Sequence, residues 1–269
     1  MKKIIPIITS LHLFLFSQSV FSKTILVSDI DDTIKNSHVL DLDELLRNSI
    51  KTAHMSFMGM ADVYQKMVDD KTIDSIVYLS NAPKSLMHKY HQLFLDQNQF
   101  PEGTLILKRH IFTKNHKVRA LRQLIEEQSP DELLLIGDNG EHDTEIYEQI
   151  ESEYPKLKMT TFIHQVYSKF GVDNNFGKPL EQGQLGFATS VDLSAQLKKQ
   201  NFLSDESYAS IISTFIPVAL EDRLFPSWQD CRDLELIDFP STRAEDEELI
   251  SKFESKLLDR CINMSLVSL

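Results

Sequence analysis

The chain has 269 residues, which is enough for one sizeable α/β core with additions, and no linker rich in Pro, Gly or Ser divides it. Its formal net charge of −12 at pH 7 argues against nucleic acid as a partner and against bulk electrostatic attraction to anionic membranes. We therefore expect no nucleic-acid binding and at most peripheral contact with a membrane.

The N-terminus has the form of a secretory signal. Met1-Lys2-Lys3 precedes an apolar stretch from Ile4 to Phe16, and small residues near Ser22 occupy positions that a signal peptidase reads. The apolar stretch is shorter than the about 20 residues that span a bilayer. We expect residues 1–22 to be a signal peptide and the protein to be exported, to a periplasm or to the medium; an uncleaved anchor is the alternative.

The first predicted strand ends in carboxylates. The apolar, β-branched run Thr24-Ile25-Leu26-Val27 leads directly to Asp29-Ile30-Asp31-Asp32-Thr33. An offset of two residues can aim the carboxyl groups of Asp29 and Asp31 at one point above the sheet. This arrangement suits phosphoryl transfer, with Asp29 as nucleophile and Asp31 as acid/base partner; a surface turn or a helix N-cap is the alternative.

The segment before the second predicted strand is short and mostly helical in pattern. Met60, Val63, Tyr64 and Met67 recur at i, i+3, i+4, i+7 spacing, which predicts a core-facing helix more readily than a lipid-contacting one. This segment leaves little room for a large cap. A small or absent cap would admit bulky substrates, including a head group still attached to lipid or to a protein side chain.

Two further segments offer phosphate-binding groups. The apolar run Ile76-Val77-Tyr78-Leu79 leads to Ser80-Asn81, where a hydroxyl and backbone N–H groups suit a phosphate oxygen; an ordinary turn is the alternative. Lys117 opens an amphipathic stretch, which places its ammonium at a helix N-terminus that favours anions. A solvated surface lysine is the alternative there, and Lys114 is the second candidate.

The next apolar run leads to an acidic turn bracketed by glycines. Leu133-Leu134-Leu135-Ile136 precedes Gly137-Asp138-Asn139-Gly140-Glu141-His142-Asp143. The turn carries three carboxylates, and Mg²⁺ prefers such oxygen ligands. It therefore predicts a hard-cation site, with an acidic turn that holds no metal as the alternative.

The strand candidates alternate with helical patterns. They lie near residues 24–28, 75–79, 104–107, 133–136 and 159–163. This alternation predicts an α/β fold with a Rossmann-like open parallel sheet of about five strands, covered by helices on both faces. Ligands of such sheets bind beyond the carboxyl ends of the strands, so the polar groups should share one crevice. We expect the core in residues 23–200 and a helical extension packed on it in residues 201–269.

The C-terminal part has a helix-start signal and the only two cysteines. Thr242 and Glu245 have capping-box spacing ahead of an apolar face that continues to Cys261, which predicts a docked helix. In an oxidising compartment, Cys231 and Cys261 are compatible with one disulfide; two buried thiols are the alternative.

The stretch from Tyr167 through Phe170, Phe176 and Phe187 is rich in Gly and Asn. It predicts a long loop near the active edge of the sheet, and loops of that length are often functional. Its aromatic side chains would either anchor on the core or contact substrate or membrane.

Taken in order, the motifs Asp-x-Asp-x-Thr, Ser, Lys and Gly-Asp-x-x-x-x-Asp closely resemble those of the haloacid-dehalogenase-like phosphatase superfamily. Several longer runs look like the actin-patch-type phosphatidate phosphatases. These runs are Asp29-Ile-Asp-Asp-Thr-Ile-Lys35, Tyr78-Leu-Ser-Asn-x-Pro83, His116-Lys117 and Ile136-Gly-Asp-x-Gly-x-x-Asp-x-Glu-Ile-Tyr147. The resemblance covers about residues 24–200 and includes Met60, the Phe100-Pro101-x-Gly103 turn and, more weakly, Leu185 to Phe202.

The resemblance implies a Mg²⁺-dependent phosphomonoesterase, most readily one that converts phosphatidate to diacylglycerol and phosphate. Asp29 would form an aspartyl-phosphate, while Asp31 protonates the departing oxygen and later deprotonates water. Asp31 must be neutral at the first step, so crowding by Asp29 and Asp138 is expected to raise its pKa. The alternatives are a phosphatase of a soluble phosphomonoester or phosphoprotein, and a non-catalytic binding protein on the same fold.

By the same resemblance, two sets of residues would hold the substrate and the cation. The expected substrate-binding set is Thr33, Ser80, Asn81 and Lys117. The expected Mg²⁺ ligands are Asp29, the backbone carbonyl of Asp31, Asp138 and Asp143, with Glu141 in reserve.

The chain departs from its apparent relatives at two positions. Asn139 stands where serine is usual, and it would offer an amide close to the metal site. His164 stands where arginine is common, and the loss of a fixed positive charge would make phosphate or head-group binding weaker or pH-dependent.

Overall fold

The computed structural model describes residues 22–38, 56–110, 114–169, 176–221, 223–235, 237–241 and 243–262. The expected signal peptide therefore lies outside the described residues, except for Ser22, and so do residues 39–55 of the segment in which a cap would lie. No helix in these ranges is long and apolar enough to cross a membrane.

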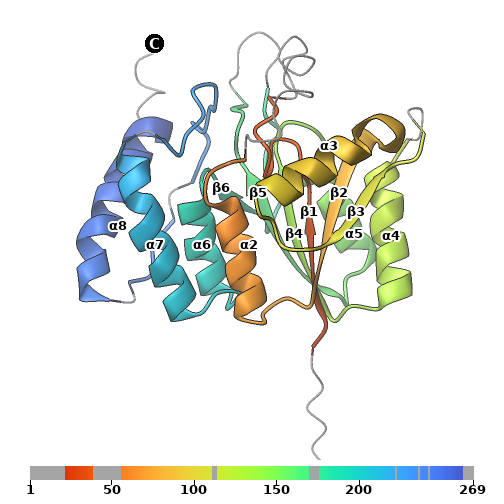
Figure 1. Cartoon of the computed structure of the whole chain (residues 1–269), viewed down its shortest axis with the longest axis horizontal. Helices are drawn as coiled ribbons and strands as arrows, with labels where there is room; N and C mark the ends of the chain where they lie inside the picture. The colour runs from red at the N-terminus through yellow and green to blue at the C-terminus, as the bar shows by residue number, and fades with distance from the viewer. Residues whose placement is uncertain are drawn as a thin grey trace, which may run out of the picture.

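The core is an open sheet of six parallel strands in the order β3-β2-β1-β4-β5-β6 (Figure 1). The strands are β1 (Thr24–Ser28), β2 (Ser75–Pro83), β3 (Thr104–Lys108), β4 (Glu132–Asp138), β5 (Lys158–His164) and β6 (Leu185–Phe187). All five predicted strands are confirmed, and so is the α/β class. The sixth strand corrects the prediction of a loop, because Leu185–Phe187 pairs with β5 as a three-residue edge strand.

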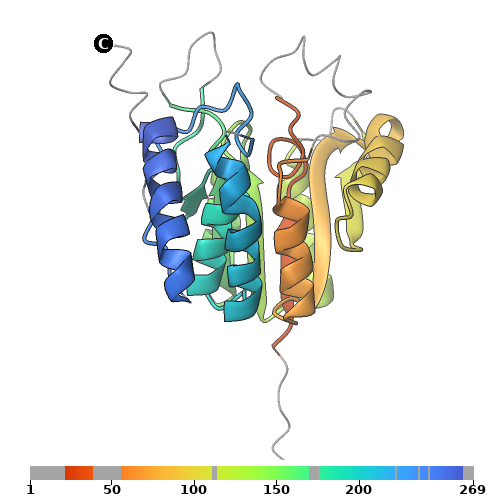
Figure 2. The same cartoon turned by 60° about the vertical axis from the view of Figure 1, so that its left-hand side comes forward.

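Helices cover both faces of the sheet. They are α2 (Met60–Asp69), α3 (Lys84–Gln97), α4 (His116–Gln128), α5 (Asp143–Glu153), α6 (Ser190–Lys199), α7 (Asp205–Leu220) and α8 (Ala244–Leu257). Side chains alternate between faces along each strand, so Leu26 packs towards α2 and α6, whereas Ile25 and Val27 pack towards α4 and α5. Figure 2 shows α2, α6, α7 and α8 side by side on the first of these faces.

The apolar stripe of α2 lies in the core, as predicted. Met60, Val63, Tyr64 and Met67 are fully buried, and the hydroxyl groups of Tyr64 and Ser28 are 2.8 Å apart. This contact ties α2 to the end of β1, next to Asp29.

The C-terminal part is helical and packs through α7 on the helices that cover one face of the sheet. Helix α7 contacts α6 and α2, and α8 packs on α7. The N-cap of α8 is Arg243 and makes no side-chain capping bond, so the predicted capping box does not start this helix; Thr242 lies outside the described residues. The domain boundary expected near residue 200 stays a prediction.

A disulfide joins Cys231 to Cys261, which decides between the two alternatives for these residues. The bond connects the segment after α7 to the π-helical turn η1 (Leu258–Ile262) that continues α8. The cross-link therefore holds the last helical segment against the chain that precedes it.

Breaking this disulfide should lower the free energy of unfolding by about 3 kcal/mol, because the bond closes a long loop in the unfolded chain. The measurement is denaturant unfolding of the wild type and of Cys231→Ala/Cys261→Ala, each with and without reductant. Reductant should weaken only the wild type. An unchanged midpoint in the reduced wild type would contradict the expectation.

Candidate active site

Chemically active side chains gather where neighbouring strands end. Asp29 follows β1 directly, Ser80 lies near the end of β2, and Asp138 is the last residue of β4. Asp143 and Lys117 lie in the first turns of α5 and α4, which start at the same edge. The parallel topology therefore brings five predicted site residues to one end of the sheet.

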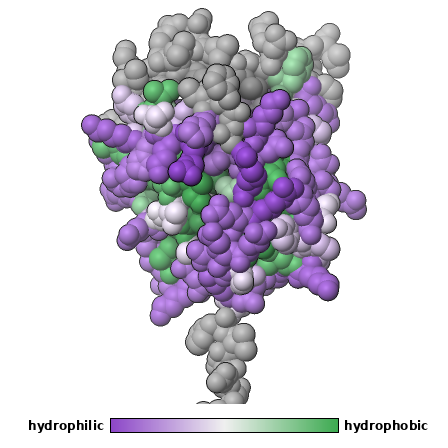
Figure 3. All heavy atoms as spheres, turned by 90° about the vertical axis from the view of Figure 1, so that its right-hand side faces the viewer, coloured by the Kyte–Doolittle hydropathy of each residue, from purple (hydrophilic) through white to green (hydrophobic). Residues whose placement is uncertain are grey.

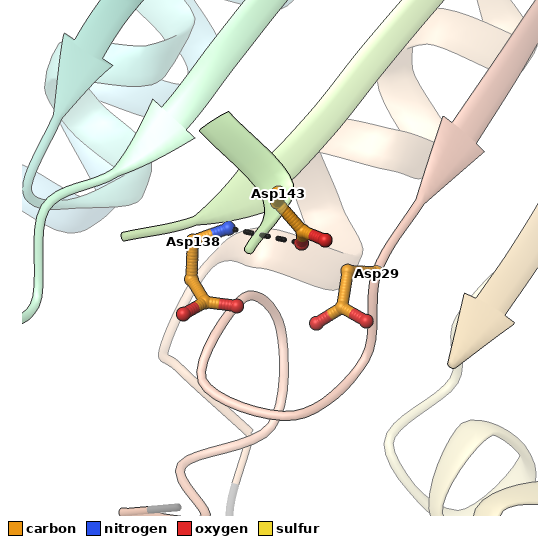
Figure 4. Close-up of side chains that lie close together, drawn as sticks. All are labelled: Asp29, Asp138 and Asp143. Atoms are coloured by element: carbon orange, nitrogen blue, oxygen red, sulfur yellow. Dashed lines mark hydrogen bonds between the residues drawn. The ribbon is translucent and has the colours of Figure 1, made fainter. Parts of the chain in front are cut away.

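Three carboxylates form a buried cluster (Figure 4). Oxygen atoms of Asp29, Asp138 and Asp143 all lie within 4.8 Å of one another. The three residues are 3, 1 and 1 % exposed, respectively. Gly140 fixes Asp138 further, because its backbone N–H donates to Asp138 Oδ1 at 2.6 Å.

Lys117 lies among these carboxylates and is itself fully buried. Its Nζ is 2.7 Å from Asp29 Oδ1, and it also forms an ion pair with Asp143. Burial lowers the pKa of Lys117, but the negative charges of Asp143 and Asp29 outweigh it and raise that pKa well above its ordinary value. The side chain is therefore a fixed ammonium group, and the alternative of a solvated surface lysine is excluded.

Two of the carboxylates hold a proton more readily than usual. Burial is the largest cause that raises the pKa of Asp29 and of Asp138, and the charge of Asp143 adds to it in both. Lys117 opposes the shift at both positions without cancelling it. The single ammonium of Lys117 thus does not balance the negative charge of three ionised carboxylates.

This donor set fits a hard divalent cation. Carboxylate oxygens are the ligands that Mg²⁺ prefers, and a cation here would supply the positive charge that the cluster lacks. Asp29, Asp138 and Asp143 are the residues that would hold it. Glu141, the reserve ligand, accepts a hydrogen bond from Asn81 Nδ2 at 3.3 Å.

Asp143 reaches the cluster across Gly137. A Cβ built on Gly137 would lie 2.6 Å from Asp143 Oδ2 and 2.7 Å from Asp143 Cβ. Asp143 Oδ2 also accepts a 3.4 Å hydrogen bond from the backbone N–H of Asp138. The glycine before Asp138 thus leaves the space that Asp143 occupies.

Asp31 lies apart from this cluster, in different surroundings. Ser37 Oγ donates to Asp31 Oδ1 at 2.7 Å, and Lys35 Nζ lies 3.5 Å from the same oxygen. Asp31 Oδ2 lies 3.5 Å from both His91 Nε2 and Ser80 Oγ. The carboxyl group is 20 % exposed, so it retains contact with solvent.

The expected pKa shift of Asp31 is wrong in direction. Burial raises this pKa, but the charges of His91 and Lys35 and the hydrogen bond from Ser37 outweigh burial and lower it. The crowding that was expected to act on Asp31 acts on Asp29 and Asp138 instead. The reason is that Asp31 faces Lys35 and His91, whereas the other two face carboxylates.

The remaining predicted substrate-binding residues lie at the same edge. Thr33 is buried, with Oγ1 3.1 Å from Asp29 Oδ2 and 3.5 Å from Asp138 Oδ2, so its hydroxyl faces the carboxylates. Ser80 Oγ accepts a 3.0 Å hydrogen bond from the backbone N–H of Ala82. Ser80 and Asn81 belong to β2, whose pairing with β3 becomes irregular between Ser80 and Pro83, rather than to a turn after it. Lys114, the alternative lysine, is exposed.

Sequence reasoning missed two residues that shape this site. His91 on α3 is fully buried and faces Asp31, but its spacing in the sequence gives no signal of that contact. Asp32 has a φ of 60° and accepts hydrogen bonds from the backbone of Ser37, at 2.9 Å, and from Tyr167 OH, at 2.6 Å. Its place inside the first motif was a signal that it organises the loop.

His164 supplies no fixed positive charge, as expected, and its effect on phosphate or head-group binding stays a prediction. Its ring is fully buried, with Nδ1 3.0 Å from Thr33 O and Nε2 3.1 Å from Ala188 O. Burial lowers the pKa of His164 to about 4, so the ring is neutral near pH 7 and does not replace an arginine charge. It packs against the Phe187 and Phe57 rings as part of the core.

Asn139 holds a loop rather than the metal site. Its Oδ1 accepts from the backbone N–H groups of Val166 and Tyr167, at 3.0 and 3.1 Å, and its Nδ2 donates to Tyr167 O at 2.6 Å.

The aromatic side chains of the predicted loop differ in exposure. Tyr167 and Phe187 are buried, whereas Phe176 is exposed; Phe170 lies outside the described residues.

The buried carboxylate cluster with its one ammonium lies beyond the carboxyl ends of parallel strands, which is where open α/β sheets bind their ligands. The family model described as "Phosphatidate phosphatase APP1, catalytic domain" matches residues 24–165. The chain belongs to this family, which confirms the resemblance drawn from its motifs.

Two fungal relatives share this region. The chain is 29 % identical over 150 residues to phosphatidate phosphatase APP1 of Saccharomyces cerevisiae. The matched region covers 51 % of this chain and 25 % of that protein. It is 27 % identical over 157 residues to an uncharacterized protein of Schizosaccharomyces pombe, covering 54 and 26 %. The chain thus spans about a quarter of each relative.

Among solved structures, a class C acid phosphatase from Bacillus anthracis with tungstate bound aligns with 72 % of this chain and 79 % of its own. The TM-score is 0.34 and the identity 18 %. This likeness is too low to bear on the fold or the site.

Gly137→Ala should displace Asp143 and lower the hydrolysis of an aryl phosphate at least about tenfold, because a shift of about 1 Å in a site of this kind has a large effect. Gly183→Ala is the matched control: Gly183 has a φ of 92° and no atom within 4 Å of a built Cβ. The control should lose stability without losing activity. Equal activity of both variants and the wild type would contradict the positioning role of Gly137.

Proposed function

We propose that this chain is an exported, Mg²⁺-dependent phosphomonoesterase that acts through an aspartyl-phosphate on Asp29, with phosphatidate as its substrate. The observation that carries the proposal is the buried cluster of Asp29, Asp138 and Asp143 around Lys117, in a region that matches a phosphatidate phosphatase catalytic domain. The proposed nucleophile Asp29, the ammonium of Lys117 and the proposed Mg²⁺ ligands then lie next to one another.

In the proposed first step, an Asp29 carboxylate oxygen attacks phosphorus, and the bond to the leaving oxygen breaks. Lys117 holds Asp29 by an ion pair and balances negative charge on the transferring group. A bound Mg²⁺ would neutralise negative charge on the phosphoryl oxygens and lower the pKa of the Asp29 carboxyl. Thr33 orients Asp29 through its hydrogen bond, and Ser80 would donate to a phosphoryl oxygen.

Asp31 is the proposed proton donor to the leaving oxygen and the later base for water. Its pKa is lowered in the free protein, so it must gain its proton as the substrate binds. An incoming phosphate group supplies a negative charge next to the carboxyl, and a like charge favours the protonated form. The partial exposure of Asp31 allows this exchange with solvent.

Phosphatidate is proposed as substrate because residues 24–165 match the model of a phosphatidate phosphatase catalytic domain. Export is proposed from the N-terminal pattern, and the Cys231–Cys261 disulfide supports it, because disulfides persist in oxidising compartments. A soluble phosphomonoester as substrate is the outcome that a substrate panel would reveal.

The proposal predicts phosphate release from dioctanoyl phosphatidate with Mg²⁺ and none after treatment with EDTA. Asp29→Asn should lower the rate on the order of 10⁴-fold or more, because the nucleophile is lost. The measurement compares phosphatidate, lysophosphatidate, sugar phosphates and an aryl phosphate. Turnover that survives chelation or the substitution in folded protein would refute the mechanism, while turnover of the aryl phosphate alone would refute the lipid substrate.

Lys35→Met should shift the pH profile of kcat/KM. Lys35 lowers the pKa of Asp31, and activity falls as pH rises through the pKa of the proton donor. Removal of the charge raises that pKa, so the alkaline limb should move to higher pH. Lys35→Arg keeps the charge and should leave the limb in place. A limb that stays fixed in Lys35→Met would exclude Asp31 as the group that sets it.

A further inference from the structure

The outer face of α3 carries apolar side chains that no described part of the chain covers. Leu86, Tyr90 and Leu93 are 60, 38 and 39 % exposed. Their i, i+4, i+7 spacing places them in one stripe along the helix. Phe94 and Leu95 of α3 pack into the core, so this helix has apolar side chains both towards the core and on its outer surface.

Three lysines lie around this stripe, although the chain is acidic overall. Lys89 lies beside the stripe, and Lys84 lies at the start of α3. Lys108 is next to that start, because it pairs in register with Pro83. We call Lys84, Leu86, Lys89, Tyr90, Leu93 and Lys108 together the α3 surface.

The three lysines of the α3 surface are available to a partner. Lys84 and Lys89 are exposed and Lys108 is half-buried, and none of them pairs with a carboxylate of the described ranges. Figure 3 shows the side of the molecule that carries α4, where hydrophobic patches interrupt a mainly hydrophilic surface. The α3 surface thus combines apolar contact with unpaired positive charge.

The α3 surface lies next to the candidate active site. In Figures 1 and 2, α3 lies at the end of the sheet where the strands finish, and it runs obliquely across them in Figure 1. Its N-terminus follows Ser80 and Asn81 along the chain, and its inner face carries His91, 3.5 Å from Asp31. Whatever binds the outer face is therefore one helix diameter from the site.

We propose that the α3 surface docks on an anionic lipid bilayer and so places the active site at the lipid surface. The inference rests on the proposed function for its biological sense, since phosphatidate is an anionic lipid that resides in bilayers. An apolar stripe flanked by lysines is the pattern of helices that lie in a membrane interface. Tyrosine suits that interface, because its ring is apolar and its hydroxyl is polar.

Charge favours lipid over a second copy of the chain. In a two-fold symmetric dimer the same patch meets itself, so Lys84, Lys89 and Lys108 would face lysines and repel. An anionic bilayer instead neutralises them. The net charge of −12 does not prevent this docking. Attraction between the lysines and the bilayer acts within a Debye length of about 10 Å, so it depends on the charges of the α3 surface rather than on the net charge of the chain.

The test is sedimentation of the full chain with phosphatidylcholine vesicles that contain phosphatidylglycerol, an anionic lipid without a phosphomonoester. Leu86→Ser/Leu93→Ser should lower the partition coefficient at least about tenfold, because two apolar side chains are lost from the interface. Lys89→Glu should lower it about fivefold or more and reduce its salt dependence. All variants share residues 1–21, so differences between them report on α3.

Val68→Ser and Lys156→Glu are the matched controls. Val68 is a similarly exposed apolar residue near the end of α2, and Lys156 is an exposed lysine before β5; both lie towards the opposite end of the sheet. The controls should bind vesicles as the wild type does, and every variant should hydrolyse an aryl phosphate at the wild-type rate.

The outcomes separate this inference from the proposed function. Vesicle binding by the α3 variants equal to that of the controls overturns the docking surface, even when aryl phosphate hydrolysis is intact. A wild-type dimer that Leu86→Ser/Leu93→Ser dissociates, without any binding to vesicles, overturns it in favour of a second copy. Binding that depends on α3 in a protein without hydrolysis on any substrate supports the surface and refutes the function.

Discussion

The ion pairs of Lys117 with Asp29 and Asp143 are the contacts on which the rest of the site depends. They join the end of β1 to the starts of α4 and α5, which are distant in sequence. All three groups are buried, so each would be strongly disfavoured in its charged form without the others. Removal of one partner from such a buried pair usually costs about 3–5 kcal/mol, because it leaves a charge uncompensated. The same contacts that hold the strand ends together therefore also fix the direction of the Asp29 carboxylate.

This arrangement also explains why the carboxylates differ. Asp29 and Asp138 face other carboxylates in a buried space, so burial and repulsion raise their pKa values. Asp31 is only two residues from Asp29, but it points to Lys35, His91 and Ser37, and its pKa is lowered. Asp29 and Asp31 thus lie two residues apart on one loop, but their pKa values shift in opposite directions. In the proposed mechanism a bound cation would offset the raised pKa of Asp29 so that its carboxylate can attack, whereas Asp31 exchanges its proton with solvent.

The sequence was sufficient for the sheet and for most of the cluster, for a physical reason. Buried parallel strands are continuous apolar runs, and their carboxyl ends must meet at one edge, so the sequence alone predicts that Asp29, Ser80 and Asp138 lie together. Lys117 was placed by the helix that it opens. What the sequence did not reveal depends on packing between distant segments. His91 meets Asp31 only because α3 crosses the strand ends, and His164 is neutral because Phe57 and Phe187 enclose it. The strand β6 has three residues, too few for a periodic pattern.

Helix α3 connects the interior of the site with the molecular surface. Its inner face places His91 against Asp31, and the chain that enters it carries Ser80 and Asn81. A change in the position of α3 would therefore alter the surroundings of Asp31 before those of Asp29, which Lys117 and Thr33 hold independently of this helix. If the outer face of α3 rests on lipid, as we propose, the group nearest the docked surface is the proton donor rather than the nucleophile. This order suits a substrate whose leaving group is the lipid itself, because the leaving oxygen must emerge on the side of the site that faces the bilayer.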